Sequence, residues 1–205
     1  MEIIFIICIL LISVSFHEFA HGWAAYCCGD STAKDAGRLT LNPISHIDPV
    51  GTIAMPILFA VLKFLNIPII PIAWAKPVPV NFGRLKNPKR DMIWVGLAGP
   101  MANMILVLIF VLCKKLIGPF NIELNNLLYL GIFVNLLLGV FNLIPIPPLD
   151  GSRIVMGILP NKYAIQYAKA ERFGFAIVIV LVMSGWLFKI IDPIVKILLS
   201  FVYKI

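Results

Sequence analysis

The chain has 205 residues, of which 60% are hydrophobic and only 13% are charged, and its mean hydropathy is +0.98. Globular domains contain roughly 45–50% apolar residues, so this composition excludes a soluble protein and predicts a single integral membrane domain over residues 1–205. The net charge of +7 could suit nucleic acid, but the basic residues mostly flank apolar segments. We therefore expect the lipid bilayer as a partner and no nucleic acid.

The first apolar segment, residues 3–28, is long enough to cross a membrane and carries three ionisable side chains close together. His17 and His21 are four residues apart, so on a helix both imidazoles lie on one face and can bind one zinc ion. Glu18 lies beside them, where it can accept a proton from a metal-activated water. Because ionisable groups at membrane depth are costly and tend to be functional, this pattern predicts zinc-dependent hydrolysis inside a bilayer.

The next part of the chain is less regular. Residues 30–50 are polar and rich in turn signals, and three prolines interrupt the apolar segment at 51–74. Two more prolines lie in the alternating stretch at 75–80, which predicts an extended strand. Basic residues are densest at 84–91, so we expect this region on the cytoplasmic side.

Two uninterrupted spanning helices are expected at 92–116 and 127–144. The second leads through a proline-rich turn to Asp150, after which comes a polar segment with a short amphipathic helix. The last apolar block, 173–203, is broken by Asp192-Pro193 and can cross the membrane once or twice. We assign residues 1–155 to the core of the domain and 156–205 to a C-terminal helical segment.

A catalytic zinc ion usually has three protein ligands and leaves the fourth position to water, so one ligand is still missing. His46 is the third histidine, and among the few carboxylates Asp48 and Asp150 are the two candidates. Asp150 directly follows an apolar helix, and Gly151 allows a sharp turn that could hold a carboxylate at membrane depth in non-helical backbone. The sequence therefore favours Asp150 and one zinc ion per chain, with His46 and Asp48 bracing the loop.

Three segments together resemble the site-2 protease family of intramembrane zinc metalloproteases, in its compact form without a PDZ or CBS domain. They are His17-Glu-Phe-Ala-His21, Gly99-Pro-Met-Ala-Asn103 and Asn142-Leu-Ile-Pro-Ile-Pro-Pro-Leu-Asp150-Gly151. The resemblance extends over residues 8–155 and implies that His17, His21 and Asp150 bind zinc and that Glu18 is the general base.

The resemblance also implies roles for two asparagines. Asn142 matches a family residue that helps to place the substrate or to stabilise the oxyanion, so we count it as catalytic. Asn103 matches a position that packs near the active site. Helix packing through the small residues Gly96, Gly99 and Ala102 would explain Asn103 equally well.

Bringing Asp150 to the two histidines requires an even number of membrane crossings between them. Segments 92–116 and 127–144 supply two, so 51–74 must re-enter or form a hairpin. We therefore predict an all-α polytopic membrane protein with about 4–6 transmembrane helices and a re-entrant or β-hairpin element between the first and second full spans. The N-terminus should lie outside the cell membrane, with the active site toward the cytoplasmic side.

The predicted function is that of a zinc metalloendopeptidase that cleaves transmembrane segments of membrane proteins, as in regulated intramembrane proteolysis. Two alternatives stay open: a transporter or ion carrier with buried His and Asp, and a non-catalytic metal-binding membrane scaffold. The missing internal repeat and the presence of Glu18 argue against a transporter. The sequence does not specify the substrate, the trigger for cleavage or the oligomeric state.

Overall fold

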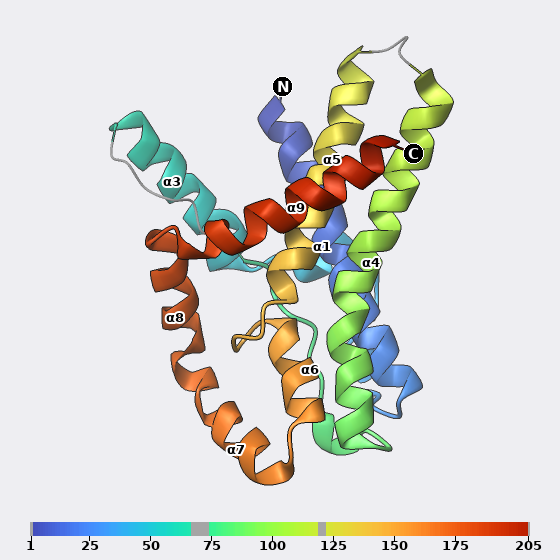
Figure 1. The fold of residues 1–205 in the computed structure, drawn as a ribbon, viewed down its shortest axis with the longest axis vertical. Coiled ribbons are helices and arrows are strands. Elements are labelled where there is room, and N and C mark those ends of the chain that lie inside the picture. Colours follow the sequence, from blue (N-terminus) through green and yellow to red (C-terminus); the bar gives the residue numbers. More distant parts are fainter. Residues whose placement is uncertain (1, 67–73, 119–121, 205) are drawn as a thin grey trace.

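The computed structural model describes residues 2–66, 74–118 and 122–204, and these residues form an elongated bundle of helices (Figure 1). The three longest apolar helices are α1 (Glu2–Cys27), α4 (Pro88–Ile117) and α5 (Ile122–Asn142). Within the described residues these 3 helices are long and apolar enough to cross a membrane, or up to 4 spans if one bent pair of helices counts as a span. The all-α membrane class is confirmed, whereas the larger predicted number of spans is not.

The remaining elements are shorter or less regular. In chain order they are α2 (Thr32–Asp35), η1 (Pro43–His46), η2 (Pro49–Ala54), α3 (Met55–Phe64), η3 (Phe82–Arg84), α6 (Asp150–Ile158), α7 (Asn161–Lys169), α8 (Glu171–Met183) and α9 (Trp186–Lys204).

Helices α8 and α9 form the bent pair, with an angle of 75° between them. The bend was expected at Asp192-Pro193, but the break falls at Gly185, whose φ of 74° is a left-handed conformation that glycine adopts without strain. Pro193 instead lies inside α9. A glycine with positive φ ends the helix, and the proline that sequence reasoning relied on does not.

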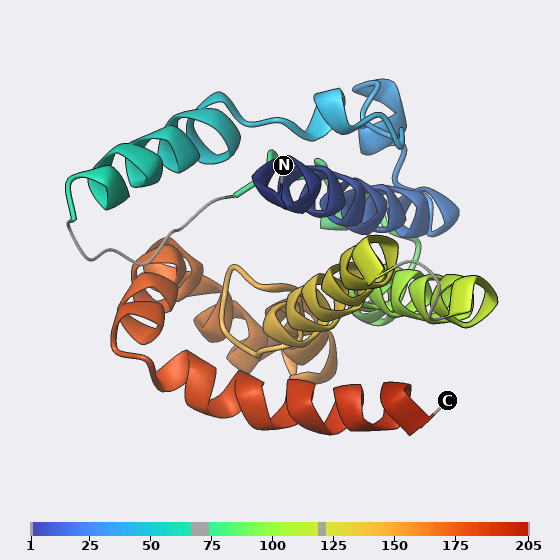
Figure 2. The same cartoon turned by 90° about the horizontal axis from the view of Figure 1, so that it is seen from above.

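Helix α4 packs against α1, α5 and α6. A separate apolar core forms where α9 lies across α5 (Figure 2). Leu187, Ile191 and Val195 repeat every four residues on one face of α9 and are at most 3% exposed. Ile105, Leu108 and Leu112 of α4 point outward and are more than half exposed, as a lipid-facing helix surface requires.

The excursion through η2 and α3 leaves the bundle and comes back to the point where it left. The N–H of Trp74 donates to the carbonyl of Gly51 over 3.4 Å, and the Thr52 hydroxyl donates to the carbonyl of Trp74 over 2.9 Å. The Trp74 ring packs so closely on Gly51 that a Cβ there would lie 2.5 Å from ring atoms. Because its two ends meet, the segment at 51–74 does not carry the chain from one end of the bundle to the other.

The predicted hairpin form of this excursion is not confirmed. No β-strand occurs in the described part of the chain, and residues 74–81 run without regular secondary structure. The prolines at 68 and 71 lie outside the described residues.

Candidate metal centre

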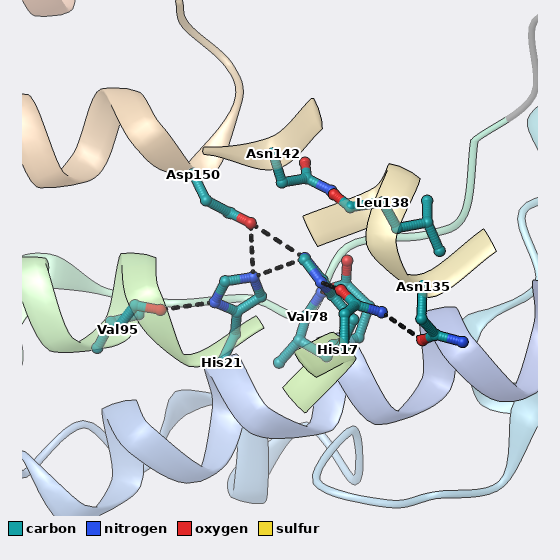
Figure 3. Close-up of polar contacts among 10 residues, drawn as sticks. His17, His21, Val78, Val95, Asn135, Leu138, Asn142 and Asp150 are labelled. Atoms are coloured by element: carbon teal, nitrogen blue, oxygen red, sulfur yellow. Dashed lines mark hydrogen bonds and ion pairs between the residues drawn. The ribbon is translucent and has the colours of Figure 1, made fainter. Parts of the chain in front are cut away.

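His17, His21 and Asp150 meet at one point in the interior of the bundle (Figure 3). Asp150 Oδ2 lies 3.0 Å from His17 Nε2 and 3.2 Å from His21 Nε2, and the two Nε2 atoms are 3.0 Å apart. Both histidine residues are buried, with exposed fractions of 7% and 8%. The structure thus brings together the three residues that the sequence singled out, although Asp150 is far from the two histidines in the sequence.

This triangle of donor atoms fits a zinc ion. In a tetrahedral site with bonds of about 2.0–2.1 Å, the corners lie about 3.3–3.4 Å apart, close to the distances of 3.0, 3.0 and 3.2 Å observed here. Asp150 Oδ2 is buried and accepts no hydrogen bond within the described structure. A buried carboxylate oxygen without a donor is costly, and a cation at the centre of the triangle would remove that cost.

The opposite ring nitrogens of the two histidines are held by hydrogen bonds. The Nδ1–H of His21 donates to the carbonyl of Val95 over 2.7 Å, and that of His17 donates to Asn103 Oδ1 over 2.6 Å. These contacts leave the lone pair of each Nε2 directed at Asp150, the tautomer that a metal ligand needs. Asn103 was expected near the site for either catalysis or helix packing, and it contacts a candidate ligand directly.

Helix α4 passes very close to both imidazoles at Gly99. A Cβ at this position would lie 2.5 Å from Cε1 and Nε2 of His17 and would also collide with His21 Nε2. Glycine is therefore required here by space, because any larger residue would occupy the volume that the histidine rings fill.

Asp150 is the first residue of α6, so the expectation of non-helical backbone at this position was wrong. A tight turn at 143–149 leads from α5 into α6 and sets Asp150 against the histidines. Gly151 does not have the positive φ of a sharp glycine turn. A Cβ at Gly151 would lie 2.5 Å from the carbonyl oxygen of Ile144, so close backbone packing explains this glycine.

Glu18 lies on α1 beside the two histidines and contacts the segment at 74–81. Its Oε2 accepts a hydrogen bond from the N–H of Val78 over 2.8 Å. The same segment is fastened by the N–H of Lys76, which donates to the carbonyl of His46 over 3.0 Å, and by the N–H of Asn81, which donates to Asp30 over 2.7 Å. A carboxylate and an irregular stretch of backbone therefore lie together next to the candidate metal centre.

Asn142 ends helix α5, close to Asp150 (Figure 3). Its Nδ2–H donates to the carbonyl of Leu138 in its own helix over 3.0 Å. Among the described residues no hydrogen bond joins Asn142 to the candidate ligands, so its catalytic role stays a prediction.

His46 and Asp48 brace the loop before α3, as the sequence suggested. His46 is 2% exposed, and its Nε2–H donates to the carbonyl of Thr40 over 2.9 Å. Asp48 accepts hydrogen bonds from the N–H groups of Val50 and Gly51 and so caps η2. Neither residue belongs to the candidate metal cluster.

Sequence reasoning missed two polar residues near the site, Ser13 and Asn135, which are both fully buried. Each lies in an apolar spanning helix, where an unexplained polar side chain is itself a signal. Amides and hydroxyls are not among the usual ligands of zinc, so a ligand pattern in the sequence does not point to these two residues.

Two imidazoles and a carboxylate around one point, with a second carboxylate alongside, define the site of a mononuclear zinc hydrolase embedded in membrane-spanning helices. The model of peptidase family M50 matches residues 111–185, a segment that contains Asp150. The "Putative zinc metalloprotease YwhC" of Bacillus subtilis is 38% identical over 188 residues, which are 88% of this chain and 80% of the relative. The chain therefore belongs to peptidase family M50, the site-2 proteases, and is an intramembrane zinc metalloprotease.

Two further relatives agree. The "Putative zinc metalloprotease Rip2" of Mycolicibacterium smegmatis is 30% identical over 187 residues, which are 88% of this chain and 69% of the relative. The "Zinc metalloprotease MJ0392" of Methanocaldococcus jannaschii is 37% identical over 106 residues, which are 50% of this chain and 30% of that protein. No solved structure gives a significant match.

Proposed function

We propose that His17, His21 and Asp150 hold one zinc ion and that Glu18 is the general base for cleaving transmembrane segments of membrane proteins. The observation that carries this assignment is the convergence of the three donor atoms to within 3.0–3.2 Å of one another, from two helices that are distant in the sequence. In addition, Asp150 Oδ2 is buried and accepts no hydrogen bond among the described residues, which is unusual for a carboxylate that binds no cation.

When bound, zinc supplies Lewis acidity to the scissile carbonyl and to the attacking water. Glu18 accepts the proton that the water loses and then donates it to the leaving amine. The N–H of Val78 fixes one oxygen of Glu18, so the carboxylate is oriented before the substrate binds. By resemblance to the family, Asn142 stabilises the developing oxyanion or places the substrate carbonyl.

The test is a cleavage assay on the purified chain in lipid with a membrane-spanning peptide as substrate. Glu18→Gln should keep one zinc per chain and lose cleavage by about 10²–10⁴-fold, because only the proton acceptor is removed. Asp48→Asn is the matched control, since it alters a carboxylate that caps η2 and should leave both zinc and cleavage unchanged. Cleavage by Glu18→Gln at the wild-type rate would show that another group is the base.

We also propose that the N-terminus lies outside the cell membrane and the active site toward the cytoplasm. Two contacts support the return of residues 28–87 to one side: the N–H of Lys86 donates to the carbonyl of Cys28 over 2.9 Å, and the N–H of Asn81 donates to Asp30. The end of α1 and the start of α4 are thereby joined, and the basic residues of this region would face the cytoplasm. Segment 51–74 is then re-entrant, so α4 and α5 are the two full membrane crossings between the histidines and Asp150.

A further inference from the structure

A chain of buried polar side chains continues beyond the contact between His17 and Asn103. It passes from α4 to α5 and returns to α1 through Asn103, Asn135 and Ser13, each of which is 0% exposed. Asn103 Nδ2–H donates to Asn135 Oδ1 over 2.9 Å, and Asn135 Nδ2–H donates to Ser13 Oγ over 2.9 Å. The second hydrogen on Asn135 Nδ2 is donated to the carbonyl of Gly131 over 2.8 Å.

The carbonyl of Gly131 determines the direction of the hydrogen bonds that link Asn135, Asn103 and His17. A backbone carbonyl can only accept, so the nitrogen of the Asn135 amide must face Gly131 and its oxygen must face Asn103. The Asn103 amide must then direct its nitrogen at Asn135 and its oxygen at His17. An oxygen facing His17 Nδ1 requires a proton on that nitrogen, which leaves the lone pair on Nε2.

The two histidines therefore reach the same tautomer by different routes. His21 donates directly to a backbone carbonyl, that of Val95. His17 instead contacts an amide side chain at Nδ1, which could present either its oxygen or its nitrogen. An additional fixed partner is needed to select the oxygen, and Asn135 is placed to provide it.

We propose that Asn135 is a positioning residue that acts through Asn103, with Ser13 completing its hydrogen bonds, to hold His17 in the Nδ1–H tautomer with Nε2 directed at the metal. The proposal rests on the assignment of His17 as a zinc ligand. The alternative is a purely structural role, because hydrogen bonds of buried amides between helices also hold the helices together. The two roles differ in whether a change at Asn135 alters the tautomer of His17.

The tautomer can be read by nitrogen NMR of the full chain labelled with ¹⁵N-histidine, since the protein contains only 3 histidines. In the zinc-free protein, the neutral forms of His17 and His21 should both carry their proton on Nδ1. His46, which donates to Thr40 through Nε2, should show the opposite pattern and serves as an internal reference. A wild-type His17 protonated at Nε2 would overturn the proposal without any variant.

Asn135→Leu should convert His17 to a mixture of tautomers and leave the signals of His21 and His46 unchanged. Zinc affinity, measured by competition with a chelator, should fall about 10-fold, at the lower end of the range for partners of metal ligands. The matched control is Asn126→Leu, an exposed asparagine on the same helix, which should change neither quantity.

A double-mutant cycle separates positioning from packing. In an Asn103→Leu background the link to His17 is already broken, so adding Asn135→Leu should cost no further zinc affinity. An equal loss in both backgrounds would mean that Asn135 only supports the fold, which contradicts the proposal. Failure of the ligand assignment itself is distinguishable, because His17→Ala would then bind zinc like the wild type while the tautomer pattern in the zinc-free protein would still hold.

Discussion

At Gly99 the backbone of α4 lies against the ring of His17, with no room for a methyl group between them. Gly99→Ala would place a Cβ 2.5 Å from His17 Nε2, so the helix or the imidazole must move. Because displacement of about 1 Å can cost about 10²-fold in rate, we expect cleavage to fall by that order and zinc to bind more weakly. Cleavage rate and chelator competition measure the two effects.

The control for this variant is Met101→Ala, on the same helix but 52% exposed on its outer face. It should keep wild-type zinc affinity and cleavage. Equal behaviour of the two variants would show that the close approach at Gly99 is not important to the site.

For individual residues, the sequence predicted the reactive groups but not the residues that form hydrogen bonds with them. His17, Glu18 and His21 are visible because their spacing on one helix has a direct chemical meaning. The hydrogen bonds from Val78 to Glu18 and from Asn103 to Asn135 join elements whose mutual packing no local pattern specifies. Gly151 was expected to allow a sharp turn, whereas the structure shows that close packing against the carbonyls of Leu143 and Ile144 leaves no room for a side chain.

At the scale of elements, Asp30 joins the end of α1 to the segment that contacts Glu18. Its carboxylate is fully buried and accepts hydrogen bonds from the N–H and hydroxyl of Thr32 and from the N–H of Asn81. Burial alone would raise the pKa of Asp30, but these hydrogen bonds, aided by the charge of Arg84, outweigh it and hold the pKa below its ordinary value of 3.8. The ionised form is thus the one that the fold stabilises.

A carboxyl whose pKa is lowered on folding contributes stability that is fully present above about pH 4 and is lost as the pH falls through the folded pKa. Asp30→Asn should lower the free energy of unfolding at pH 7 by about 1.5–3 kcal/mol, and the difference from wild type should shrink toward about pH 3. Thermal unfolding in detergent at both pH values measures this, with the exposed Asp35→Asn as control. A gap that widens in acid would contradict the assignment.

The hydrophobic pattern predicted the limits of the membrane-spanning helices α4 and α5 to within a few residues. The helices expected at 92–116 and 127–144 are observed as Pro88–Ile117 and Ile122–Asn142. The C-terminal break was misplaced because the φ of Gly185 depends on how α9 packs on α5, which hydropathy does not report.

For the whole molecule, the chemistry constrains the path of the chain, because both parts of the metal centre must lie at the same depth. The prediction that 51–74 returns to the side where it began rests on that requirement. The number of spans beyond three does not, because α8 and α9 form one bent pair. A reporter fused before residue 2 should be accessible from outside the cell. One inserted at Gly37, where an added Cβ would meet no atom within 4 Å, should be cytoplasmic. Two reporters on the same side would refute this orientation.

We expect two histidines of α1 and an aspartate at the start of α6 to bind the same zinc ion. X-ray absorption at the zinc edge of the purified wild-type chain tests it most directly. The spectrum should show one zinc per chain with only nitrogen and oxygen neighbours at about 2.0–2.2 Å, and Asp150→Ala should alter the spectrum or lose the zinc. Sulfur neighbours at about 2.3 Å, supplied by cysteines such as Cys27 and Cys28, would contradict it.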